Sequence, residues 1–246
     1  AVKEIRPEAV FHFAAKALVG ESVSHPASYY ETNVRGTLEL LNSLRALPSL
    51  PVVIFSSSCS VYGVTQNALS ELDPIAPTNP YARTKRMAEE ILADYGQAYG
   101  LKSVSLRYFN AAGCDPDGEI GELHDPESHL IPRLLLHSLD PASHPVTIFG
   151  EDYDTPDGTC IRDYVHVEDL ARAHISAMSR LLAGSSSDVF NLGSGVGYSV
   201  REVIRAVEKV AGKKLDVPVG PRRAGDPPRL VAGSKKARSL LDWVPQ

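Results

Sequence analysis

The sequence predicts an α/β protein whose main body is a doubly wound parallel sheet. Short apolar runs that suit buried strands alternate with longer amphipathic runs that suit helices, giving strand, helix, strand, helix, strand over residues 9–109. Small or polar residues follow each strand, at Ala14, Ser56 and Asn110. Ligands of such sheets bind at the carboxyl ends of the strands, so this edge is the expected site.

The first half of the chain carries three strands and two long helices. Strands are predicted at residues 9–13, 52–55 and 103–109, and a helix tail is predicted at residues 1–5. Residues 20–25 are predicted to form a loop. A helix should then run over residues 26–47, with Pro26 in its first turn, and another from Tyr81 to Tyr99, ending at Gly100.

The regular alternation of strands and helices ends after Gly113. This change predicts a smaller mixed α/β lobe over the open end of the sheet. A loop is expected at 115–127, helices at 130–139, 167–182, 199–211 and from about Ser234, and strands at 146–149, 160–165 and 189–192. The expected domains are therefore 1–113 for the nucleotide-binding sheet and 114–246 mainly for the lobe, with 160–192 returning to the main sheet.

Bulk properties exclude several function classes. The 246 residues are 43 % hydrophobic with a formal charge of −5, which argues against nucleic acid or an anionic membrane as partner. The three cysteines lack paired spacing, as in a reduced, cytoplasmic protein. The eight histidines lack metal-ligand spacing, so no metal site is expected. No apolar run reaches membrane-spanning length.

Tyr81 and Lys85 are the first candidate catalytic pair. A spacing of four on a helix places both side chains on one face, where the ammonium should lower the pKa of the phenol. A tyrosine in that state could act as a general acid and base. Chance supplies such a pair in many helices, and the alternative is a packed tyrosine beside a solvated lysine. Ser58, in the serine cluster that follows an apolar strand, supports the catalytic interpretation.

The motifs together resemble the extended short-chain dehydrogenase/reductases and, within them, the UDP-glucose 4-epimerases. Ser58, Tyr81 and Lys85 match the Ser-Tyr-Lys set, and the strings at 12–15, 19–22, 56–58, 61–63, 107–110, 158–167, 191–193 and 222–226 match the narrower group. The resemblance implies a Rossmann-like fold, an NAD cofactor, a UDP-hexose substrate, a homodimer and reversible epimerisation at C4. The family's initial strand, glycine-rich turn and helix have no counterpart here, so we expect a chain truncated at its N-terminus and slightly at its C-terminus.

The resemblance also implies the site residues. Those near NAD would be Phe13, Ala14, Ala15, Lys16, Asn33, Ser56, Tyr81, Lys85 and Tyr108. Those near the UDP-sugar would be Ser58, Ser60, Tyr81, Asn110, His129, Leu130, Phe149, Arg162, Arg223, Asp226 and Leu230.

Several of these residues have a simpler structural explanation. Phe13, Leu130 and Phe149 could belong to the core, and each arginine could form an ion pair with Asp163 or Asp226. Lys16 lies one residue earlier than the lysine of many relatives, which argues against a phosphate role for it. Leu230 is smaller than the tyrosine of some members, which favours a pocket that also admits N-acetylhexosamines.

Three other functions compete with epimerisation. A nucleotide-sugar 4,6-dehydratase needs an Asp-Glu pair where this chain has Cys59-Ser60. A decarboxylase needs a cationic clamp for the sugar carboxylate, and none is identified. A non-catalytic UDP-sugar-binding protein would explain the missing glycine-rich turn, but it would not need Ser58, Tyr81 and Lys85.

Overall fold

A parallel four-stranded sheet forms the centre of the computed structural model, which describes residues 2–63, 67–223 and 226–246. Its strands, in spatial order, are β1 (Ala9–His12), β2 (Val52–Ser58), β3 (Ser103–Tyr108) and β7 (Asp188–Leu192). The register places Val53 beside Ser103 and Val104 beside Asp188. Ala1, in the predicted helix tail, and Ala224 and Gly225, in one family motif, lie outside the described residues.

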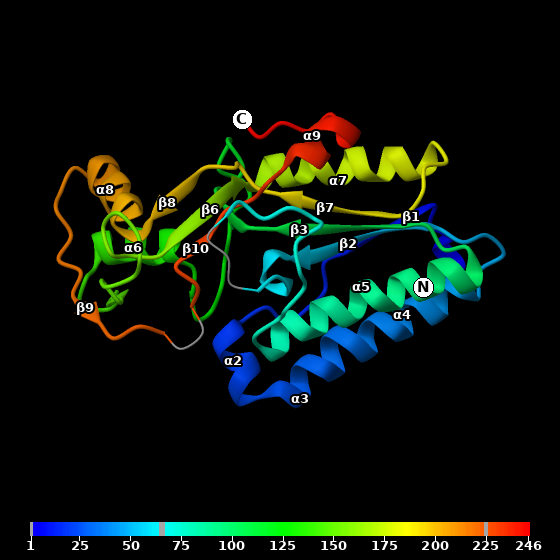
Figure 1. The fold of residues 1–246 in the computed structure, drawn as a ribbon, viewed down its shortest axis with the longest axis horizontal. Coiled ribbons are helices and arrows are strands. Elements are labelled where there is room, and N and C mark those ends of the chain that lie inside the picture. Colours follow the sequence, from blue (N-terminus) through cyan, green and yellow to red (C-terminus); the bar gives the residue numbers. More distant parts are fainter. Residues whose placement is uncertain (1, 64–66, 224–225) are drawn as a thin grey trace.

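Helices cover both faces of this sheet, which confirms the doubly wound prediction (Figure 1). α4 (Gly36–Arg45) and α5 (Pro80–Tyr99) pack on one face, and α7 (Val167–Leu182) and α9 (Lys235–Leu241) on the other. Side chains alternate along a strand, so β2 sends Val53 and Phe55 toward Leu92 of α5 and sends Ile54 toward Ala173 of α7. Two buried cores thus hold the central strands.

Local sequence explains where α5 begins and ends. The Asn79 side chain accepts a hydrogen bond from the Ala82 N–H at 2.9 Å, and Pro80 occupies the first helical position. Gly100 ends the helix with a φ of 75°, a left-handed conformation that glycine adopts without strain. The predicted helix from Tyr81 to Tyr99 is confirmed with an error of one residue.

The predictions for residues 19–47 were partly wrong. Val19–Ser24 forms a short helix, α2, where a loop was predicted. Buried Tyr29 fixes it, because its hydroxyl lies 2.7 Å from both the Leu18 carbonyl and the Glu21 carboxylate. The expected continuous helix is divided into α3 (Pro26–Tyr29), a π-helical segment η1 (Tyr30–Arg35) and α4.

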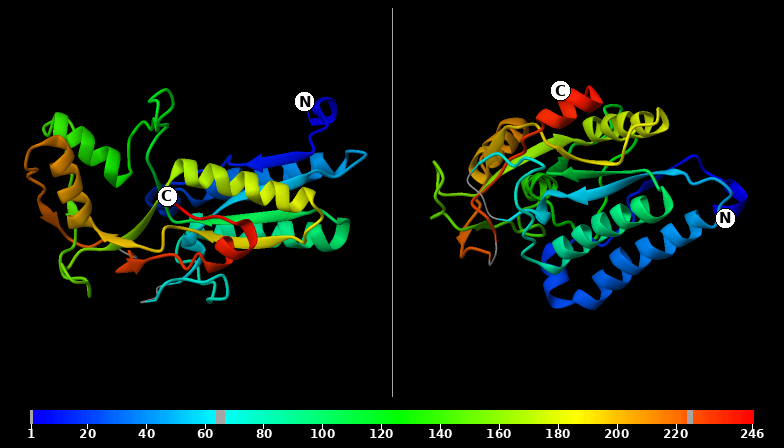
Figure 2. Two further views of the ribbon diagram at one scale, coloured as in Figure 1. Left: turned by 90° about the horizontal axis from the view of Figure 1, so that it is seen from above. Right: turned by 45° about the vertical axis from the view of Figure 1, so that its right-hand side comes forward.

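The smaller lobe grows from the end of the main sheet. Beyond Phe109 the chain enters β4 (Asn110–Ala112), which leaves the main sheet and pairs with β6 (Ile161–His166). The other short elements are α1 (Val2–Ile5), η2 (Cys59–Val61), α6 (Leu130–Leu139), β5 (Ile148–Phe149), β8 (Gly197–Ser199), α8 (Val200–Ala211), β9 (Val219–Gly220) and β10 (Arg229–Leu230). Figures 1 and 2 show α6 and α8 at one end of the molecule, beyond the carboxyl ends of the main strands.

Residues 160–192 contribute to both parts. β6 belongs to the second sheet with β4, β8 and β10, whereas α7 and β7 belong to the main body. Asp163 of β6 connects the two: its buried carboxylate accepts hydrogen bonds from the backbone N–H groups of Ser194, Gly195 and Ala232, at 2.8, 2.9 and 3.0 Å. No helix among the described residues is long and apolar enough to cross a bilayer.

Candidate active site

A cavity of about 1170 Å³ lies where the main strands end and the smaller lobe begins. Most of the predicted site residues line it: Phe13, Ala15, Ser56, Ser58, Ser60, Tyr81, Lys85, Tyr108, Asn110, His129, Leu130, Phe149, Arg162, Arg223, Asp226 and Leu230. Of the predicted set, Ala14, Lys16 and Asn33 are not among the described residues that line it.

Asn33 holds backbone around the cavity and does not face it. Its buried side chain accepts from the Lys16 N–H at 2.8 Å and donates to the Lys16 carbonyl at 3.0 Å. It also donates to the Thr84 hydroxyl of α5 at 2.9 Å. The Lys16 ammonium pairs with Glu21 at 2.9 Å. The structure therefore ties the segment after β1 to the helix that carries Tyr81.

Ser58, Ser60 and Tyr81 meet at the end of β2. The hydroxyl oxygens of Ser58 and Ser60 are 2.8 Å apart, and the Ser60 N–H also donates to the Ser58 hydroxyl. Burial raises the pKa of Tyr81 to about 12, an effect that the Ser58 hydroxyl opposes and Cys59 reinforces. Burial is therefore the main influence on the acidity of Tyr81 in this structure.

The prediction that Lys85 lowers the pKa of Tyr81 was wrong. The ammonium lies 5.9 Å from the centroid of the Tyr81 ring and donates instead to the Ser56 carbonyl at 2.6 Å. Lys85 is only 3 % exposed, and burial lowers its own pKa to about 8, although Glu89 acts in the opposite direction. The four-residue spacing correctly placed Tyr81 and Lys85 on one face of the helix. It could not show which group accepts the hydrogen bond of the Lys85 ammonium.

A buried ionic network lies directly behind Lys85. Arg107 of β3 donates to both carboxylate oxygens of Glu89, at 2.8 and 2.7 Å, and to the Tyr62 hydroxyl at 2.7 Å. The Ser57 hydroxyl donates to the same carboxylate at 2.6 Å. Because Glu89 lies one turn after Lys85, these bonds fix α5 against β2 and β3 at the level of the catalytic candidates.

Arg162 and Arg223 place two guanidinium groups at the side of the cavity formed by the smaller lobe. Arg162 pairs with Asp226 at 2.9 Å and also donates to the Pro227 carbonyl, so the ion-pair alternative applies to it even though it lines the cavity. The Arg223 guanidinium stacks on Phe149, 4.1 Å from the ring centroid, and remains exposed. Both groups can still donate to an anion, because a guanidinium has five N–H donors.

Sequence reasoning did not single out several lining residues. Arg133 and Tyr164 border the cavity, and so do Glu122, His124 and Glu127 of the loop before α6. Arg133 lies one helical turn after Leu130, a spacing that could have identified it. The loop residues carried no such periodic signal.

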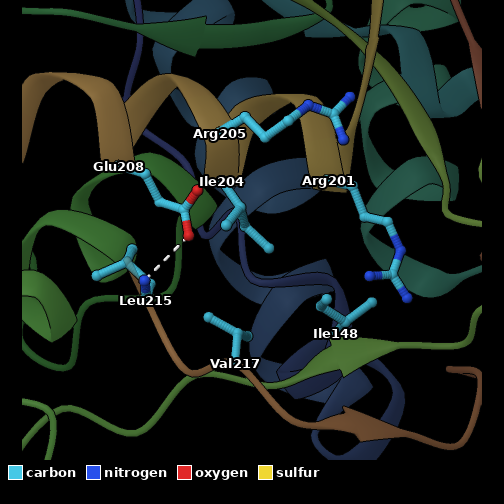
Figure 3. Close-up of a pocket in the computed structure, with 7 residues that line it drawn as sticks. All are labelled: Ile148, Arg201, Ile204, Arg205, Glu208, Leu215 and Val217. Carbon is cyan, nitrogen blue, oxygen red and sulfur yellow. Dashed lines mark hydrogen bonds between the residues drawn. The ribbon is translucent and has the colours of Figure 1, made fainter. Parts of the chain in front are cut away.

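A smaller cavity of about 200 Å³ lies wholly within the lobe (Figure 3). Ile204 of α8 faces Ile148 and Val217 across it, and Glu208 accepts from the Leu215 N–H at 3.0 Å. None of the catalytic candidates lines it, so the chemistry is assigned to the large cavity.

Comparisons with known proteins agree with this geometry. Residues 1–193 match the NAD dependent epimerase/dehydratase family. A UDP-glucose 4-epimerase of Halalkalibacterium halodurans is 49 % identical over 240 residues, which make up 97 % of this chain and 71 % of that protein.

Solved structures give the same result. The UDP-glucose 4-epimerase of Brucella ovis in complex with NAD is 48 % identical, with a TM-score of 0.95 over 100 % of this chain and 75 % of that one. The enzyme of Bifidobacterium longum in complex with NAD+ and UDP is 39 % identical, with a TM-score of 0.90 over 97 % and 72 % of the two chains. The chain therefore belongs to the NAD-dependent epimerase/dehydratase family, in the group of the UDP-glucose 4-epimerases.

Proposed function

We propose that this protein catalyses the reversible epimerisation of a UDP-hexose at C4, interconverting UDP-glucose and UDP-galactose. One observation carries the proposal: Ser58, Tyr81 and Lys85 line the same cavity as Arg162 and Arg223. This combination supplies an acid/base group at one end and cationic donors for a diphosphate at the other. Cys59, at a position where a dehydratase needs a carboxylate, is a buried thiol whose pKa burial raises to about 12.

Tyr81 is the proposed acid and base. It takes the proton of the sugar 4-hydroxyl and later returns it, while Ser58 donates a hydrogen bond to the same oxygen and orients it. NAD, when bound, would supply the hydride chemistry that these side chains lack, by accepting hydride from C4 and returning it. The Ser58 hydroxyl also lowers the pKa of Tyr81, which favours the phenolate that takes this proton.

The residues at the strand ends of the cavity support the proposal that NAD binds on that side. Phe13, Ala15, Ser56, Lys85 and Tyr108 surround the carboxyl ends of β1, β2 and β3. We propose that Lys85 contacts the nicotinamide ribose and that the Asn33 tether keeps the backbone after β1 in place for the cofactor.

Firm binding of UDP has to accompany loose binding of the sugar, because the 4-keto intermediate must present its other face. Arg162 and Arg223 are the proposed diphosphate ligands, with Asn110, Leu130 and Phe149 around them. Leu230 is half-buried at the cavity wall and leaves more room than an aromatic side chain would. We therefore propose that the pocket also admits UDP-N-acetylhexosamines.

NMR of the anomeric protons tests the main proposal. Purified protein incubated with UDP-galactose, without added NAD, should produce UDP-glucose. Loss of the product in Tyr81→Phe would assign the reaction to this site. Absence of UDP-glucose even after NAD is added would refute epimerisation, and the same spectra would then reveal a dehydration product. Decarboxylation needs a separate incubation with a UDP-uronic acid, because UDP-galactose has no carboxylate to lose.

The assembly and location are also proposals. A homodimer is the family expectation, and α4 and α5, which lie side by side on one face of the sheet, offer a helix pair for it (Figure 1). Light scattering after size exclusion would measure the mass. The three free cysteines support a cytoplasmic location, which cell fractionation would test.

A further inference from the structure

We propose that the loop before α6 binds a divalent cation of the zinc class through Glu122, His124, Glu127 and His129. Each residue offers one ligand atom, and the four atoms lie within 4.8 Å of one another. Imidazole nitrogens and carboxylate oxygens are both ligand types that zinc accepts, and four of them can complete a tetrahedral site. The sequence analysis predicted no metal site. These four residues lie on an irregular loop, and their spacing matches neither one face of a helix nor a zinc-finger pattern.

The donor atoms already converge. Nδ1 of His124 lies 2.8 Å from Oε1 of Glu122 and 3.7 Å from Oε2 of Glu127. Nδ1 of His129 also contacts Oε1 of Glu122 and lies 3.5 Å from Oε1 of Glu127. The two imidazole rings lie beside each other, with centroids 5.0 Å apart and planes tilted by 55°.

Backbone groups orient one of the carboxylates. Oε1 of Glu127 accepts hydrogen bonds from the N–H groups of Ser128 and His129, at 2.6 and 2.7 Å. The Glu127 side chain is only 11 % exposed, whereas the imidazoles remain accessible. Hydrogen bonds of this kind, from the protein to a metal-binding carboxylate, hold the carboxylate in position before the metal binds.

A cation here would fix one rim of the large cavity. All four residues line that cavity, and the loop that carries them runs from β4 to α6. The proposal concerns the order of this loop and does not depend on the reaction. Because His129 is also an expected substrate contact, the metal should change the KM for a UDP-sugar more than kcat.

Zinc titration of chelator-treated protein tests the proposal. Cys114, an exposed thiol of the same cavity wall, is replaced by Ser in every sample so that it cannot bind the metal. Competition with a chromophoric chelator should show one Zn²⁺ per chain. His124→Gln and Glu127→Gln should each lower the affinity at least about tenfold.

His25→Gln is the matched control, since His25 is an exposed imidazole outside the cluster, and its zinc affinity should be unchanged. Co²⁺ should give the visible absorption bands of a tetrahedral site, and both cluster substitutions should remove them. Failure to bind zinc, or an affinity that either cluster substitution leaves unchanged, would overturn the assignment. Both readouts are independent of catalytic activity.

Discussion

Replacing Lys85 by Met should change how the stability of the protein depends on pH. Burial lowers the pKa of Lys85 from 10.5 to about 8 in the folded state, whereas the unfolded chain keeps the ordinary value. Between these values the unfolded state binds more protons than the folded state. The free energy of unfolding contributed by Lys85 therefore rises with pH across this window.

The size of the effect follows from the shift. One pKa unit corresponds to about 1.4 kcal/mol, so the full contribution is on the order of 3 kcal/mol, of which about 2 kcal/mol falls between pH 7 and pH 9.5. Lys85 is almost completely buried, so solvent screening does little to reduce it. Methionine has a similar length and no titratable group.

Urea unfolding of the NAD-free protein at the two pH values measures this contribution. The stability of the wild type relative to Lys85→Met should increase by about 2 kcal/mol from pH 7 to pH 9.5, because all other titrating groups are common to both proteins. Lys102→Met, which removes an exposed lysine, is the matched control and should follow the wild type. Parallel pH profiles for the wild type and Lys85→Met would refute the argument that burial sets the pKa of Lys85.

Three further changes test other parts of the structure. Tyr81→Phe should lower kcat about 10²–10⁴-fold in a coupled epimerase assay while the purified protein retains its NAD; retained turnover would exclude Tyr81 as the acid/base group. Arg107→Met removes the two-point partner of buried Glu89 and leaves Arg86, at 3.4 Å, as its remaining cation, so urea unfolding should show a loss of up to about 3–5 kcal/mol, and a loss below about 1 kcal/mol would contradict the role of the Arg107–Glu89 pair. Leu230→Tyr should abolish turnover of UDP-N-acetylgalactosamine but keep that of UDP-galactose; equal loss of both would argue against a sugar-size filter.

The sequence predicted those elements that its local chemistry controls. Apolar runs without alternation marked the buried strands, and the cap at Asn79 and the stop at Gly100 bounded the helix that carries Tyr81. The polar residues at the strand ends were predicted to share one edge, and Ser56, Ser58 and Asn110 do line a single cavity. Hydrophobic periodicity and helix-capping residues are properties of a short segment, so they can be recognised in the sequence without knowledge of the fold.

Features that depend on distant partners were not predictable in this way. The helix Val19–Ser24 exists because Tyr29 bonds to Leu18 and Glu21, a contact that local propensity does not contain. The direction of Asn33 depends on Thr84, about 50 residues away. Burial sets the pKa of Tyr81, and the Lys85 ammonium donates its hydrogen bond to the Ser56 carbonyl. The four-residue spacing determines neither.

The late glycine-rich run, Gly193–Gly197, has a use that its composition would not suggest. A Cβ atom on Gly193 would lie 2.6 Å from the Asp163 carboxylate, so only glycine lets the turn approach that closely. The Ser194 and Gly195 N–H groups then bind the carboxylate as the N–H groups of a phosphate loop bind a nucleotide. This turn is an anion-binding loop whose anion is one of the protein's own side chains, and an Asp163→Asn substitution would replace one of the two acceptor oxygens by an NH2 group that faces backbone N–H donors.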